Sequence, residues 1–239
     1  MKNLFKLLLV TLALASCVAK VSQLNHTNYH HMFLTDHTDS MTSANSSQVM
    51  ASLNQVDLEK DGVEIEIQGI SEIGIDKVYR MNLAPVISRL LSNDYQRRTQ
   101  EIPRFKSELQ SALATMEQSR KTPQDRTVLF SPLLSMLEKA SASKADKRRL
   151  YIYSDLMHND ALSFYHESTM KKLEDQSNWE ELQNIAFQGK PLPDLSGVEI
   201  YVVHRPESPE KARVFGKVSA FLTWVLESRG ARVYIRASL

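Results

Sequence analysis

The sequence contains a single cysteine, Cys17, among 239 residues. No disulfide can form within the chain, which excludes the cysteine-rich scaffolds of small secreted proteins. Glycine is also scarce, with seven residues, and no G-x-x-x-x-G-K-[ST], G-x-G-x-x-G or G-x-S-x-G sequence occurs. Phosphate-cradling loops and the nucleophile elbow of hydrolases are therefore not expected, and we predict that the protein is not an enzyme.

Charge of one sign is not in excess. The formal net charge is +1, and 27 basic and 28 acidic side chains remain once Lys2 and Lys6 are removed with the N-terminal segment. A near-neutral domain lacks the electrostatic field that attracts nucleic acid, so no nucleic-acid partner is expected. Apolar residues make up 42% of the chain, as in a globular domain, and the length suits one well-filled core.

Long hydrophobic runs are limited to the N-terminus. The apolar stretch at residues 7–14 follows the two lysines and is too short to span a bilayer. It leads into Leu14-Ala15-Ser16-Cys17, which resembles the lipobox of bacterial lipoproteins, where a peptidase cuts before a cysteine that carries lipid. An ordinary signal peptide and an uncleaved anchor are the alternatives.

The resemblance to a lipobox divides the chain into three parts. It implies a signal peptide at residues 1–16, a lipidated Cys17 with a short tether over residues 17–28, and one domain over residues 29–239. The expected location is the cell envelope, with the lipid anchor as the contact to the membrane. Val18, rather than Asp, follows the cysteine, which favours the outer membrane, facing the periplasm, in a Gram-negative source.

Beyond the tether, apolar segments alternate between strand-like and helix-like spacing. Strands are predicted at residues 29–35, 63–67, 76–81, 150–153, 198–203 and 233–235, and helices at residues 49–56, 102–116, 131–137, 161–182 and 214–226. Glu64, Glu66 and Gln68 alternate with apolar residues, which predicts one solvent-facing side for that strand. The order predicts an α/β fold: a doubly wound, mostly parallel sheet with one antiparallel edge hairpin and helices on both faces.

Polar side chains follow two of these strands. Asp36-His37-Thr38-Asp39-Ser40 comes after the first strand, and Ser154-Asp155 comes after the strand at residues 150–153. Because ligands of such sheets bind at the carboxyl ends of the strands, these side chains are the candidates for a site. Ser131-Pro132 has the composition of a helix N-cap and first helical residue, so Ser131 begins the following helix.

This set resembles the metal-ion-dependent adhesion site of von Willebrand factor A-like (vWA-like) domains, and the resemblance covers roughly residues 29–239. It carries an Asp-x-Ser-x-Ser motif onto Asp36, Thr38 and Ser40, and the later aspartate onto Asp155. Ser131 takes the position of the hydroxyl on a middle loop, for which Thr127 and Thr122 are rivals. His37, Asp39 and His158 would flank the site.

The resemblance implies a divalent cation, Mg²⁺ or alternatively Mn²⁺ or Ca²⁺, with one position open for an acidic side chain of a partner protein. Carboxylate and hydroxyl oxygens are the ligands that these hard cations prefer. Together with the anchor, this indicates a lipoprotein that binds a protein partner in an adhesion or assembly scaffold of the cell envelope.

Simpler interpretations stay open. Asp36 can form an Asx-turn and Ser40 or Ser131 can cap a helix without any metal, which would leave a structural envelope lipoprotein with a degenerate vWA-like fold. Its partner surface would be the helix predicted at residues 161–182. Zinc is a further alternative because histidines are numerous, but no H-E-x-x-H occurs, and His30 and His31 should point to opposite faces of their strand. A metal-dependent hydrolase is the third and weakest option.

Overall fold

A computed structural model describes residues 25–36, 46–71, 74–86, 92–119 and 127–239. The predicted signal peptide, Cys17 and most of the tether lie outside these residues, and so do His37, Thr38, Asp39, Ser40 and Thr122. No helix among the described residues is long and apolar enough to cross a membrane.

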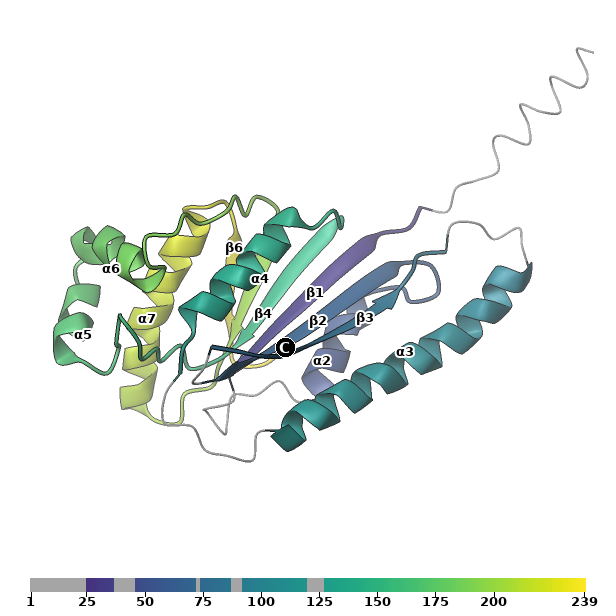
Figure 1. Ribbon diagram of the computed structural model, residues 1–239, viewed down its shortest axis with the longest axis horizontal. Coiled ribbons are helices and arrows are strands. Elements are labelled where there is room, and N and C mark those ends of the chain that lie inside the picture. The colour runs from purple at the N-terminus through teal and green to yellow at the C-terminus, as the bar shows by residue number, and fades with distance from the viewer. Residues whose placement is uncertain (1–24, 37–45, 72–73, 87–91, 120–126) are drawn as a thin grey trace, which may run out of the picture.

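Six strands form one sheet in the order β3-β2-β1-β4-β5-β6 (Figure 1). β2 and β3 pair antiparallel, and every other neighbouring pair is parallel. The strands are β1 Asn28–Asp36, β2 Gly62–Ser71, β3 Gly74–Leu83, β4 Lys147–Tyr153, β5 Val198–Val203 and β6 Arg232–Arg236. The predicted fold class, a mostly parallel α/β sheet with an antiparallel edge pair, is confirmed.

Helices cover both faces of the sheet (Figure 1). Apolar side chains of α4 and α7 pack on one face with Met32, Leu34 and Ile152, and those of α2 and α3 pack on the other face with Phe33 and Ile65. The helices are α2 Ser46–Ser52, α3 Ser92–Ser119, α4 Phe130–Ala142, α5 Glu167–Leu173, α6 Trp179–Ala186 and α7 Pro209–Glu227, with short 3₁₀ turns η1 Leu53–Gln55 and η2 Gln176–Asn178.

Two of the predicted helices differ from the structure. α4 begins at Phe130, so Ser131 lies inside its first turn and the prediction that Ser131 caps it is wrong. Residues 161–166 are not helical, and the rest of the predicted helix at 161–182 is divided between α5, η2 and α6. Trp179 of this segment packs against Phe221 and Trp224 with ring centroids 6.0 and 5.7 Å apart, so its largest apolar side chain belongs to the core.

The side of β2 that was predicted to face solvent is buried over much of its length. Glu66 and Gln68 are 2% and 1% exposed, although Glu64 is exposed. Glu66 accepts a hydrogen bond from Arg80 on β3 at 3.0 Å and forms an ion pair with Lys139 on α4. These two cations outweigh the effect of burial and lower the pKa of Glu66. Charged residues that alternate with apolar ones along a strand do not always face solvent. Here a helix covers Glu66 and supplies a lysine that neutralises its charge.

Candidate metal-binding site

The strand order predicts a crevice between β1 and β4, because the direction of winding of the sheet reverses there. The chain leaves β1 in one direction to form β2 and β3, then returns to form β4 on the other side of β1. In open α/β sheets, the point where the direction of winding reverses leaves room for a ligand beyond the carboxyl ends of the strands. Asp36 ends β1 and Ser154-Asp155 follows β4, so both sequence-predicted segments lie at this point.

Asp36 is a fully buried carboxylate at the end of β1. The parallel register pairs Thr35 with Tyr153, which brings the next residue of β4, Ser154, opposite Asp36. The Ser154 hydroxyl donates a hydrogen bond to Asp36 Oδ2 at 2.8 Å. A hydrogen bond of this kind fixes the carboxylate and offsets part of the cost of burying its charge.

The turn after β4 is held by its own side chains. Ser154 Oγ accepts from the Leu156 N–H at 2.9 Å, and Asp155 Oδ1 accepts from the Met157 N–H at 2.9 Å. Leu156 adopts φ 64°, a conformation that a branched side chain rarely takes, and its side chain is fully buried in the core. The packed leucine and the two hydrogen bonds together hold Asp155 at the rim of the crevice, where its side chain is partly exposed.

The segment before α4 is tied to the same turn. The Leu129 N–H donates to Nδ1 of the buried His158 at 3.0 Å, and the Asn159 N–H donates to the carbonyl oxygen of Thr127 at 2.9 Å. His158 thus accepts from a backbone donor at the start of α4, where no side chain of the helix itself provides a cap. Thr127 is buried and lies beside the loop that carries Asp155, which makes it a better candidate for the middle-loop hydroxyl than Ser131.

Ser131 and Asp155 line different hollows. Ser131 is exposed and borders a small hollow with Ala186, Phe187 and Gln188. Asp155 borders an open pocket of about 500 Å³ between the turn after β4 and the start of α7. Among the described residues, Ser131 and Asp155 therefore do not share a pocket.

The pocket beside Asp155 was not foreseen from the sequence. It is lined by Asp155, Met157, Tyr165, His204, Glu207, Ser208, Glu210, Lys211, Val214 and Phe215. The buried His204 directly follows β5 and packs against Phe215 with ring centroids 4.8 Å apart. His204 directly follows a parallel strand, as Ser154 does, and this position was the signal that could have identified it.

The donors near the crevice suit a hard cation. Among the described residues, no group of three or more His, Cys, Asp or Glu side chains is arranged to hold a metal ion. Asp36 and Asp155 instead carry carboxylates and Thr127 carries a hydroxyl, on three chain segments that hydrogen bonds join, and Ser154 orients Asp36. This donor chemistry fits Mg²⁺ or Mn²⁺, which accept few protein ligands and retain water. Thr38 and Ser40 continue the chain just beyond Asp36 but lie outside the described residues.

The two consecutive histidines of β1 lie far from this chemistry. His30 Nδ1 is 3.0 Å from Ser143 Oγ beyond α4, whereas His31 Nδ1 is 3.3 Å from Ser52 Oγ at the end of α2. They therefore point to opposite faces of the sheet, as predicted.

Comparison with known proteins adds no family to this description: no family model matches the chain, and no curated protein sequence matches it significantly.

Proposed function

We propose that this protein is a lipid-anchored envelope protein whose vWA-like domain binds a protein partner through a divalent cation. The observation that carries the proposal is the hydrogen-bonded arrangement of Asp36 with Ser154, next to Asp155, at the switch point of the sheet. The antiparallel edge strand and the order of the acidic segments support the resemblance to vWA-like domains. The lipobox at Cys17 supports the anchor.

Each residue has a defined part in this proposal. Asp36 and Asp155 supply carboxylates, Thr127, Thr38 and Ser40 supply hydroxyls, and Ser154 orients Asp36 through its hydrogen bond. The cation, when bound, would accept a carboxylate oxygen of the partner at its open position. The pocket between Asp155 and Phe215 gives room for the partner residue next to that carboxylate.

In this proposal the anchor precedes the amino end of β1 in the chain, and the site lies at the carboxyl end of that strand. The tether reaches the strand at Asn28, and the strand ends at Asp36. The site would therefore face away from the membrane to which Cys17 is attached. This orientation suits a module that bridges its own membrane to a partner protein rather than one that acts on lipid.

Removal of the Asp36 carboxylate tests the proposal. Asp36→Ala should abolish chelator-sensitive capture of partners from detergent-solubilised envelopes. It should also remove the stabilisation by Mg²⁺, which for a site filled at about 10 to 100 times its Kd is roughly 1.4 to 2.7 kcal/mol. Capture with chelator and with Mg²⁺ restored, together with thermal unfolding in both conditions, measures these two effects.

Asp160→Ala is the matched control, because Asp160 lies in the same loop as Asp155 but outside the proposed donor set. It should keep both the capture and the response to Mg²⁺. The metal-free structural alternative is supported instead if wild-type stability and capture are indifferent to Mg²⁺, Mn²⁺ and chelator.

A further inference from the structure

On the face of the sheet that carries α2 and α3, the side chains change from aliphatic on β2 to aromatic on β4, β5 and β6. In the register of the sheet, Phe33, Tyr151, Tyr201 and Tyr234 form one row over β1, β4, β5 and β6. Neighbouring rings stack with centroids 4.8, 5.1 and 4.9 Å apart. The aliphatic residues that occupy this face on β2 are thus replaced by tyrosines toward β6.

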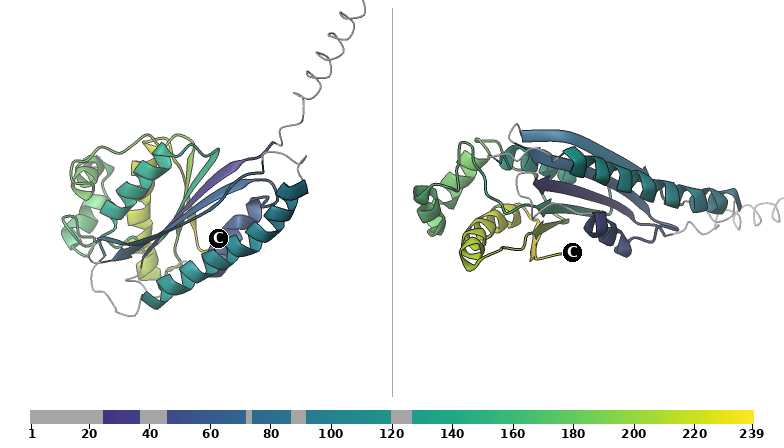
Figure 2. Two further views of the ribbon diagram at one scale, coloured as in Figure 1. Left: turned by 45° about the vertical axis from the view of Figure 1, so that its right-hand side comes forward. Right: turned by 90° about the horizontal axis from the view of Figure 1, so that it is seen from below.

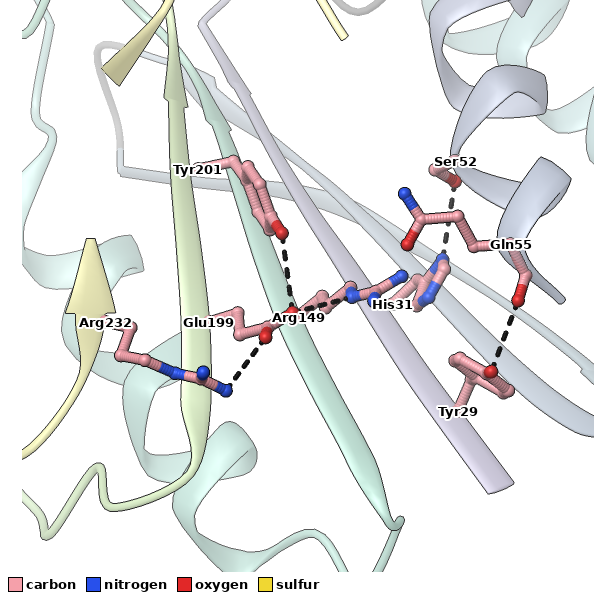
Figure 3. A network of polar contacts seen from close by, with 8 residues as sticks. All are labelled: Tyr29, His31, Ser52, Gln55, Arg149, Glu199, Tyr201 and Arg232. Atoms are coloured by element: carbon pink, nitrogen blue, oxygen red, sulfur yellow. Dashed lines mark hydrogen bonds and ion pairs between the residues drawn. The ribbon is translucent and has the colours of Figure 1, made fainter. Parts of the chain in front are cut away.

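The row beside the rings carries charge (Figure 3). Glu199 accepts from Arg149 at 2.9 Å and from Arg232 at 2.9 Å, so one carboxylate serves two guanidinium groups. Arg236 lies two residues after Tyr234 on β6, and its guanidinium carbon is 5.7 Å from the centroid of the Tyr234 ring. Three arginines and one carboxylate leave this part of the face positively charged.

The direction of winding explains why this part of the face is open. The connections from β4 to β5 and from β5 to β6 both contain helices, and these helices pack on the face of the sheet that carries α4. Right-handed crossovers between successive strands that add to the same edge of a sheet all place their helices on one face. On the opposite face, the described helices α2 and α3 pack mainly with β1, β2 and β3. Tyr201 and Tyr234 are consequently only half-buried.

A groove of about 290 Å³ runs along this region. Of the strand residues, Tyr151, Tyr201 and Arg236 line it. The other lining residues belong to α2, η1 and the C-terminal segment: Ala51, Ser52, Gln55, Ser238 and Leu239. Figure 2 shows the C-terminal end beside α2 in both views. Side chains of a single chain segment can enter such a groove, whereas a flat bilayer surface cannot contact the residues at its base.

We propose that this Tyr–Arg face, defined by Tyr151, Tyr201, Tyr234, Arg149, Arg232 and Arg236, binds an acidic amphipathic segment of a protein partner. Tyrosine and arginine are the residues most enriched at the centres of protein interfaces, because each combines a large apolar surface with a polar end. Carboxylates of the segment would pair with Arg232 and Arg236, and its apolar side chains would cover the tyrosine rings. This site is separate from the crevice at Asp36 and needs no cation.

The probe for this site is a fluorescent synthetic helical peptide rich in Glu and Leu, with a second peptide that has Lys at every Glu position. Fluorescence anisotropy should show that the acidic peptide binds the full chain and the basic peptide does not. Arg232→Glu with Arg236→Glu should weaken binding about tenfold or more, since two attractive charges become repulsive. Arg236→Glu alone, which breaks no ion pair between residues that the structure describes, should weaken peptide binding several-fold.

Arg213→Glu is the matched control, because Arg213 is exposed on α7, on the other side of the sheet. It should leave binding unchanged, and chelator should also have no effect. Equal binding of both peptides, or equal losses in Arg213→Glu and Arg236→Glu, would overturn the proposal. Vesicles of anionic phospholipid serve as the second probe, and binding to them that depends on Arg236 while peptide binding does not would assign the face to lipid instead.

Discussion

Replacement of Arg98 by methionine should lower the free energy of unfolding by about 3 to 5 kcal/mol, which is a large share of the stability of a domain of this size. The Arg98 side chain is 2% exposed and lies on α3. Its Nε donates to the carbonyl oxygen of Leu58 at 2.6 Å, and its two terminal nitrogens donate to the carbonyl oxygens of Ala84 and Asp61 at 2.5 Å each.

One guanidinium thus joins three parts of the chain: the second turn of α3, the loop before β2 and the segment after β3. Methionine fills most of the same space but leaves three carbonyl groups without their donor, of which that of Asp61 takes part in a buried hydrogen bond and the other two in partly buried ones. Lysine has a single nitrogen and cannot reach all three oxygens, so Arg98→Lys should recover less than half of the loss.

Urea unfolding measures this effect, with Arg97→Met as the control. Arg97 is the preceding residue, is 61% exposed and pairs with Glu101 at 3.3 Å on the helix surface. Its replacement should change the stability by less than about 0.5 kcal/mol. Similar losses in the two variants would show that Arg98 does not have this role.

Acid should destabilise the protein through His31. The imidazole is fully buried, its Nδ1 faces Ser52 Oγ, and Nε2 has no hydrogen-bond partner among the described residues. Because Ser52 donates its own hydrogen to the Val49 carbonyl oxygen, its Oγ accepts from Nδ1–H, which leaves Nε2 as the site of any added proton. Burial, and then the charge of Arg149, lower the pKa of His31 to about 3.

The sign of the effect follows from the difference between the folded and unfolded states. The unfolded chain takes up a proton on this histidine near pH 6.5, whereas the folded protein does so only near pH 3. The contribution of the buried, neutral His31 to the free energy of unfolding is therefore complete above pH 6.5 and is lost as the pH falls toward 3. At pH 4.5 the loss should be about 3 kcal/mol relative to pH 7.5.

Unfolding curves at a series of pH values check this prediction. His31→Phe keeps a ring against Tyr151 but cannot take up a proton, so its stability should vary less between pH 6.5 and 4.5. The loss that it retains includes that from His30, whose pKa burial also lowers. His166→Phe changes an exposed histidine and should retain the wild-type slope. The role given to His31 is wrong if both variants lose stability with acid as steeply as the wild type. Below about pH 4.5, protonation of Glu66, whose pKa is also lowered, adds a further loss in all three proteins.

The sequence was sufficient for the fold because the apolar residues repeat with clear periods. The alternation in β2 and the spacing on α7 each follow from one side of the element facing the core. It was not sufficient where long-range contacts decide the structure. The start of α4 depends on His158, which lies 29 positions after Leu129. The burial of Glu66 depends on Lys139 from a helix on the same face.

The candidate site could be predicted in part for the same reason. Asp36 and Asp155 follow recognisable strands, and parallel strands bring their carboxyl ends to one edge. The middle-loop hydroxyl could not be assigned from spacing, because the residues before α4 have no regular period. The link between Asn159 and Thr127 is what favours Thr127 over Ser131. The Tyr–Arg face was also missed, because its residues come from three strands and lie side by side only in the assembled sheet.

Binding of Mn²⁺ to the purified protein, followed by electron paramagnetic resonance, tests the central claim most directly, because the signal of free Mn²⁺ falls as the ion binds. The site at Asp36 and Asp155 predicts one bound ion per chain, displaced by Mg²⁺, lost in Asp36→Ala and in Asp155→Ala, and retained in Asp160→Ala. A wild-type protein that leaves millimolar Mn²⁺ free, or one whose bound ion persists without the Asp36 carboxylate, would contradict a metal-dependent binding site at this end of the sheet.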